Sequence, residues 1–223
     1  MRLFLNTKSS KRKAQAEVIS ALLIVGITVA AVSVAYMWGV PMIQKGQSTS
    51  QIQEAEYLMT LISDGITDVA QNGGQKSLSL NLQGPLEISE EDNTIKYTII
   101  SKKAGVARTE WVPLNEDETF GIAATNQSKS IPVYGFDKDA VLLAKSDVLG
   151  DSGFMVYYNL VFREVDDFNT REGRITNITA AGNNKVSGGT VKLMIRRNPQ
   201  IVSPSPSKLG GKLISTKVLL SLS

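Results

Sequence analysis

The sequence predicts an α+β protein in which one long N-terminal α-helix precedes a mostly antiparallel, sandwich-like β domain. Two observations predict this fold class. Apolar residues recur at helical spacing up to Val69, and from residue 76 onward they alternate with a period of two. We therefore divide the 223 residues into a basic leader (1–14), a long helix (15–73) and a β-rich head (74–223).

The composition excludes several classes of function. The chain has no cysteine and no histidine, so disulfides, thiolate nucleophiles, imidazole bases and Cys/His metal sites are ruled out. Its formal charge of +3 is misleading, because residues 1–14 carry +5 and residues 15–223 carry −2. The head thus lacks the basic face of a nucleic-acid binder. We expect no enzyme, no catalytic residue, no cofactor, no metal and no nucleic-acid partner.

The uncharged stretch from residue 18 to residue 44 is predicted to cross a membrane. Its 27 residues make a helix of about 40 Å, and a bilayer core needs roughly 20 apolar residues. Basic residues precede the stretch and the first positive charge after it is Lys45, so the N-terminus is expected in the cytoplasm and the head outside. Gly39 and Pro41 predict a kink or a short melted stretch near the outer end.

Beyond the kink, a narrow apolar seam predicts that the helix resumes. Such a seam packs either on the protein's own body or on the helices of neighbouring subunits, and both remain open. The sequence Asn72-Gly73-Gly74 is expected to end the helix. The seam consists of Ile52, Ala55, Met59, Ile62, Ile66 and Val69.

The rest of the chain is predicted to form strands. Turn-forming Gly, Pro, Asn and Asp separate the apolar runs, as expected for a β sandwich or a partly closed barrel. The expected strands are 76–82, 94–101, 107–112, 140–145, 154–165, 174–179, 190–196 and 212–222.

The N-terminal segment differs from a secretory signal, whose cleavage site follows the apolar region. Here the basic run ends at Ala14 and a short polar patch begins at Gln15, before the apolar helix. A cut between Ala14 and Gln15 would leave that helix at the start of the mature chain. Residues 11–39 read KRKAQAEVISALLIVGITVAAVSVAYMWG. This segment resembles the class III signal peptide and N-terminal helix of archaeal type IV pilin-like proteins, the group that includes archaellins.

The resemblance implies a structural role. It implies cleavage by a prepilin peptidase around Lys13, Ala14 and Gln15, and assembly by a pilus ATPase and a membrane platform protein. The precursor would be anchored in the membrane with a cytoplasmic N-terminus. The mature protein would be extracellular, in a surface filament that is a helical homopolymer. The alternative is a membrane-anchored or minor-pilin surface binding protein whose β domain captures a carbohydrate or a solute.

Glu17 is the candidate subunit contact. Type IV pilins commonly carry an acid at the fifth mature position, whereas Glu17 is third after the expected cut and Ser20 is sixth. Glu17 either forms an ion pair with the N-terminal amine of a neighbouring subunit or lies in interfacial water at the helix N-terminus, where the helix dipole favours an anion.

Weaker signals lie in the head. Asn126 and Asn177 begin glycosylation sequons and are candidate acceptors. Acidic clusters at 90–92, 115–118 and 137–139 lack the spacing of a calcium loop and are typical of solvated turns. Five aromatic residues either form a sugar-binding face or serve as core and cross-strand partners. They are Tyr97, Trp111, Tyr134, Tyr157 and Tyr158.

Overall fold

The computed structural model describes residues 7–102, 107–115, 132–135, 137–150 and 153–223, with side chains from residue 16 onward except that of Lys102. The chain divides into two compact units, Met1–Gly46 and Gln47–Ser223, which we call the N-terminal unit and the head unit. One helix, α1 (Thr7–Asn72), contributes to both.

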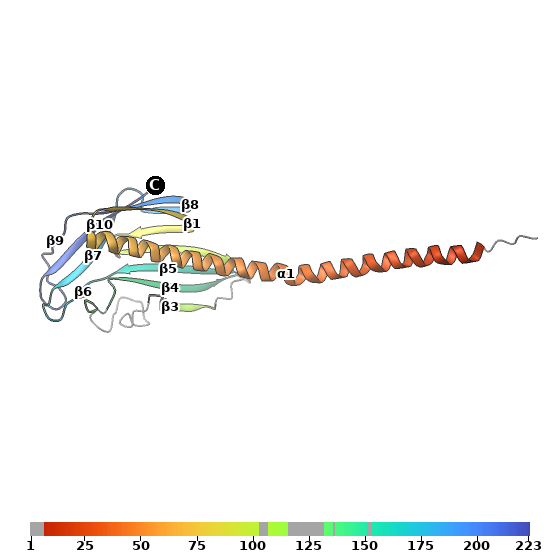
Figure 1. Ribbon diagram of the computed structural model, residues 1–223. Coiled ribbons are helices and arrows are strands. Elements are labelled where there is room, and N and C mark those ends of the chain that lie inside the picture. The colour runs from red at the N-terminus through yellow and green to blue at the C-terminus, as the bar shows by residue number, and fades with distance from the viewer. Residues whose placement is uncertain (1–6, 103–106, 116–131, 136, 151–152) are drawn as a thin grey trace, which may run out of the picture. The chain divides into compact units, whose positions relative to one another are not determined.

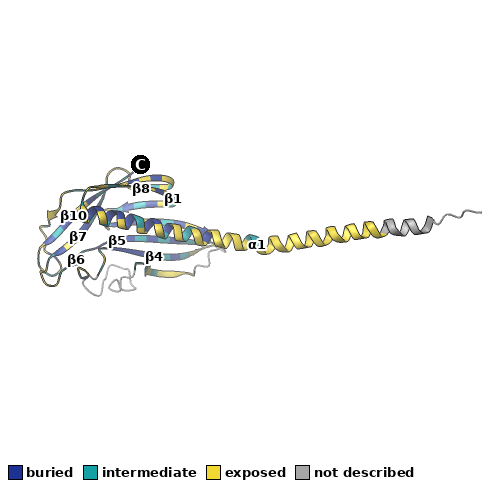
Figure 2. Ribbon diagram, in the orientation of Figure 1, coloured by how far each residue is buried: buried dark blue, intermediate teal, exposed yellow. Residues whose placement is uncertain are grey.

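In the N-terminal unit, α1 begins at Thr7, within the predicted leader, and is continuous through Gly39 and Pro41. No melted stretch interrupts it, because a proline inside a helix removes only one backbone donor while the neighbouring turns keep theirs. From residue 16 to residue 37 every residue is exposed (Figure 2).

In the head unit, α1 packs on the protein's own sheet. Met59, Ile62 and Ile66 are 0% exposed, and the remaining seam residues are buried or partly buried in the same hydrophobic cluster. The helix ends at Asn72, and the next residue, Gly73, has a left-handed φ of +80° and donates its N–H to the carbonyl of Val69 at 2.9 Å. The predicted seam and helix end are therefore confirmed, and the seam packs intramolecularly.

Ten strands follow among the described residues, and each predicted run corresponds to one of them, with 154–165 divided into two. Their order in the sheet is β3-β4-β5-β2-β1-β8-β10-β7-β6, with β9 paired to β10. The named pairs are antiparallel except β7 with β10. The strands are β1 (Gln75–Ser89), β2 (Thr94–Lys102), β3 (Thr109–Pro113), β4 (Ala140–Leu149), β5 (Gly153–Phe162), β6 (Val165–Asp166), β7 (Gly173–Ala180), β8 (Lys185–Arg197), β9 (Ile201–Val202) and β10 (Leu213–Leu222).

The strands form one hydrogen-bonded sheet that curls around the second half of α1 (Figure 1), so the sandwich-like arrangement is not confirmed. A second sheet is unnecessary because the helix itself covers the inner face. A bulge in β1 at Gly84, which packs against the carbonyl of Thr98, favours this curvature. Asn93 in the β1–β2 turn then joins distant strands, since its amide donates to the carbonyls of Phe162 (3.1 Å) and Thr176 (2.8 Å).

Two stacked tyrosines tie the helix to the sheet. The rings of Tyr97 and Tyr158 lie on the inner face with centroids 6.3 Å apart. The Tyr158 hydroxyl donates to the carbonyl of Ile52 at 3.1 Å, and the Tyr97 hydroxyl accepts from the N–H of Gln83 at 2.9 Å. Both hydroxyls are thus paired inside the core, as buried tyrosines require.

Truncating the centre of the seam should destabilise the head. We expect Ile62→Ala to lower the free energy of unfolding by about 2–5 kcal/mol, because it leaves a cavity between helix and sheet. The matched control is Ile100→Ala, at a position that is 57% exposed and should change stability by less than about 0.5 kcal/mol. Chemical denaturation followed by near-ultraviolet circular dichroism measures both; equal effects would contradict the packing.

Candidate functional site

The most conspicuous surface of the chain is the apolar segment, residues 18–43 of α1. Apart from Val40, which is partly buried, its large hydrophobic side chains are 58–76% exposed in the isolated chain (Figure 2). By length and composition this helix can cross a membrane. So large an apolar surface marks contact with lipid or with other protein.

Two hydroxyl groups of this segment are hydrogen-bonded within the helix. The Thr28 hydroxyl donates to the carbonyl of Ile24 at 2.8 Å, and the Ser33 hydroxyl donates to that of Val29 at 2.7 Å. Such back-bonding hides both hydroxyls from an apolar environment. At Gly26 a Cβ would meet nothing within 4 Å, so the notch there is open in the single chain.

The expected cleavage residues Lys13, Ala14 and Gln15 lie in the first turns of α1, and the structure does not describe their side chains. Glu17, the candidate subunit contact, is exposed. Asn126 lies outside the described residues. Asn177 is on β7, where its amide donates to the hydroxyl of Ser215 at 2.8 Å.

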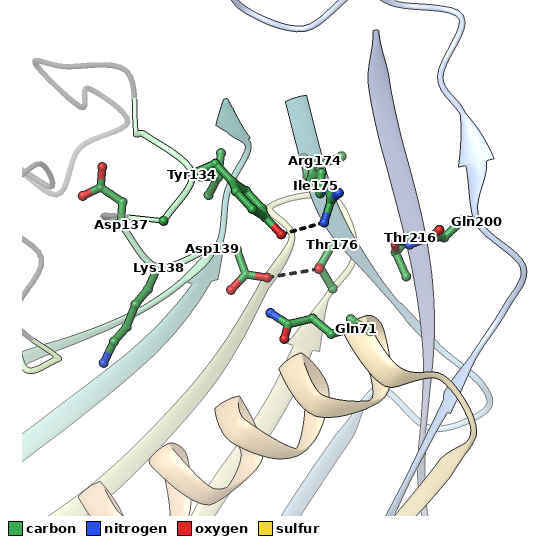
Figure 3. Close-up of a pocket in the computed structure, with 13 residues that line it drawn as sticks. Gln71, Tyr134, Asp137, Lys138, Asp139, Arg174, Ile175, Thr176, Gln200 and Thr216 are labelled. Carbon is green, nitrogen blue, oxygen red and sulfur yellow. Dashed lines mark hydrogen bonds between the residues drawn. The ribbon is translucent and has the colours of Figure 1, made fainter. Parts of the chain in front are cut away.

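The head contains a cavity of about 540 Å³ beside the end of α1 (Figure 3). Arg174 donates to the Tyr134 hydroxyl at 2.6 Å, with its guanidinium carbon 4.7 Å from the centre of the ring. Thr176 donates to the Asp139 carboxylate at 3.3 Å. These four side chains thus hydrogen-bond in pairs along the lining of the cavity, so a ligand that uses any of them must compete with an existing contact.

Asp139 illustrates the electrostatics of this cavity. Burial raises the pKa of its carboxyl, although hydrogen bonds from backbone amides and from Thr176 and the charge of Arg163 act in the opposite direction. Asp137 forms a 3.8 Å ion pair with Arg163 and accepts from the N–H of Val133 at 2.7 Å. The cluster at 137–139 therefore holds a turn together, but the Asp137 side chain is only 8% exposed and Asp139 is shielded from solvent, so the expectation of a solvated turn is wrong here.

A second pair of acids, Glu164 and Asp166, has no recognisable motif in the sequence. Asp166 is 1% exposed, and neither of its carboxylate oxygens has a hydrogen-bond partner among the described residues. A Cβ on Gly173 would stand 2.6 Å from an Asp166 oxygen and 2.9 Å from a Glu164 oxygen, so the two carboxyls converge there. The nearby Ser207 hydroxyl donates instead to the carbonyl of Arg171. The pKa of Asp166 is raised mainly because the carboxyl is buried. The negative charge of Glu164 is the second cause and acts in the same direction.

The two acids do not by themselves make a metal centre. Among the described residues, no group of three or more acids, histidines or cysteines has metal-binding geometry. The Glu164–Asp166 pair was hidden in the sequence because the acids flank a single valine and resemble an ordinary turn.

The structure separates the five aromatic candidates into three environments. Tyr97 and Tyr158 are core residues, and Tyr134 belongs to the cavity with Arg174. Trp111 and Tyr157 are partly exposed and line a second, smaller groove in the head. A single aromatic face made of all five is therefore wrong.

The fold and these surfaces define a class of protein: a β-rich head joined to a single helix that is long and apolar enough to cross a membrane. A family model described as a family of unknown function (DUF7289) matches residues 13–121, slightly less than half of the chain. The match covers the end of the leader, the rest of α1 and strands β1 to β3. No curated protein and no solved structure matches the chain.

The acid pair should make the head less stable as the pH rises. A carboxyl whose pKa is raised by folding contributes stability below its ordinary pKa of 3.8, and that contribution is lost as the pH rises toward and through the folded value. Asp166→Asn removes this loss and supplies a donor to Glu164. We therefore expect the melting temperature of the variant, relative to wild type, to increase from pH 4 to pH 7.

The comparison at each pH isolates Asp166 from Asp139, whose pKa is shifted in the same direction. Asp167→Asn is the matched control, since the pKa of Asp167 is lowered by hydrogen bonding. A difference between Asp166→Asn and wild type that stays constant with pH would contradict the paired burial of the two acids.

Proposed function

We propose that the chain is the precursor of a structural subunit of an archaeal type IV pilus-like surface filament. In this proposal a prepilin peptidase removes residues 1–14, and the helix that then begins the mature protein polymerises. The observation that carries the proposal is the apolar segment, which is largely exposed in the single chain and follows a short basic leader after a polar patch of three residues, Gln15 to Glu17.

The two halves of α1 have different surfaces, which supports separate roles in the head and in the filament. Residues 52–70 bury one face against the head and leave polar side chains outside, as a helix of a water-soluble domain does. The apolar segment has no such partner in its own unit. Before assembly, lipid can cover its surface; in a filament, other copies of the same helix can do so. The apolar surface would then never face water.

The geometry of the segment also suits close helix packing. Small residues reduce the distance between neighbouring helices in apolar surroundings. A contact that repeats without closing produces a helical fibre, so weak lateral contacts would add along the polymer. The assembly partners are then a pilus ATPase and a membrane platform protein, with the mature protein outside the cell. The small residues are Ala21, Gly26, Ala30, Ala31 and Ala35.

The alternative function is a membrane-anchored or minor-pilin surface binding protein. The observation that favours it is the groove lined by Trp111 and Tyr157 in the head. The two functions differ in abundance: a major subunit dominates sheared fibres, whereas an anchored binding protein stays with the membrane fraction.

Replacing Ala14 should block processing. We expect Ala14→Phe to leave a membrane-held precursor that retains its 14 N-terminal residues, because the bulky side chain would occupy the position next to the scissile bond. Mass spectrometry of the N-terminus, in the producing strain, measures the outcome. Wild-type protein should begin at Gln15, and Lys76→Ala, a change far from the cut, should process normally. A native chain that begins at Met1 would contradict the proposal.

Filling the notch at Gly26 should reduce polymer without harming the subunit. Because nothing lies within 4 Å of that position in the single chain, Gly26→Leu should still be inserted and cleaved, while neighbouring helices lose their close approach. The yield of sheared filaments, seen by negative-stain microscopy, should fall strongly. Val25→Leu is the size-matched control on the same helix. Normal filament yield from Gly26→Leu would exclude this position from the contact.

A further inference from the structure

The outer face of the sheet carries a straight row of polar side chains across four neighbouring strands. The register aligns Lys185 on β8 with Glu87 on β1, Glu87 with Lys96 on β2, and Lys96 with Asn159 on β5. These positions alternate with core residues, so their side chains face away from α1. Together they form one side of the groove that we call the outer groove.

Two aromatic residues form its other side. Tyr157 lies two residues before Asn159 on β5 and therefore on the same face, and Trp111 reaches the groove from β3. Neither belongs to the hydrophobic core. The groove has a volume of about 250 Å³, which lies below the range for drug-sized ligands and suits a single sugar ring.

The charges along the row are compensated. Lys185 forms a 3.0 Å ion pair with Glu87, and Lys96 forms a 2.8 Å pair with Asp92. An anionic ligand would have to break these pairs, whereas a neutral molecule with several hydroxyl groups can donate to the carboxylate and accept from the ammonium groups while they persist.

Asn159 adds an unused acceptor. Its amide oxygen has no hydrogen-bond partner among the described residues. A buried acceptor without a partner raises the free energy of the folded state. A hydroxyl bound in the groove can supply the missing donor once the amide turns toward it.

We propose that the outer groove is a binding site for a neutral sugar. The apolar face of the ring packs on Trp111 and Tyr157, and its hydroxyls bond to Asn159 and to the row of charged side chains. This site deepens the alternative function of surface binding and does not depend on whether the chain polymerises.

The test uses intrinsic fluorescence of the full chain in detergent micelles. The protein has two tryptophans, so Trp38→Phe leaves Trp111 as the sole reporter. The probes are the methyl glycosides of glucose, galactose, mannose and N-acetylglucosamine, with glycerol and glucuronate as comparators. We expect at least one neutral glycoside to change the Trp111 emission saturably, while glycerol and glucuronate do not.

Two further variants test the contacts. Tyr157→Leu keeps an apolar side chain but removes the ring, and Asn159→Ala removes the amide; each should weaken binding by about tenfold or more. Phe168→Ala, at an aromatic residue that is 56% exposed and outside the groove, is the matched control and should bind as wild type does. Thermal melting of each variant identifies any that fails to fold.

Three outcomes would overturn the proposal: no saturable change with any neutral glycoside, a change with glucuronate alone, or binding that survives both groove variants. Filament yield and glycoside binding of the wild-type protein from the producing strain separate this proposal from the structural one. Wild-type filaments without any glycoside binding would reject the groove and leave the filament subunit intact, and glycoside binding by wild-type protein that forms no filaments would do the reverse.

Discussion

The head depends on one contact, the burial of a helix face against the inner face of a curled sheet. Met59, Ile62 and Ile66 are fully buried, and strands from β4 to β7 in the sheet order contribute side chains to the same cluster. Because a single helix fills the interior, the sheet must bend around it. The bulge at Gly84 and the hydrogen bonds of Asn93 are local features that make this bend possible.

That contact also gives the two faces of the sheet different roles. The inner face packs against the helix, and even the buried hydroxyls of Tyr97 and Tyr158 are hydrogen-bonded there. The outer face does not pack against the helix, and it carries ion pairs, an amide and two partly exposed rings along one groove. A surface site can therefore change there without altering the core that holds the head together.

The same helix meets two different physical demands along its length. In the head unit it is amphipathic and its apolar face is covered, whereas in the N-terminal unit it is apolar on every side and uncovered. Within the apolar segment, the hydroxyls of Thr28 and Ser33 are hydrogen-bonded to the helix backbone and do not require water. A helix of this kind is suited to lipid and to other copies of itself, which is the basis of the proposed filament.

The sequence alone determined the local features: the long apolar helix, its seam, the stop at Gly73 and the position of nearly every strand. These follow from periodicities of 3.6 and 2 and from turn residues, which act over a few positions. Only the tertiary structure decided that the strands make one curled sheet, that Tyr157 and Trp111 share a groove, and that Asp166 is buried beside Glu164. Those features depend on the register and on contacts between residues far apart in the chain, such as Asn93 with Thr176, and such contacts leave no periodic trace in a single sequence.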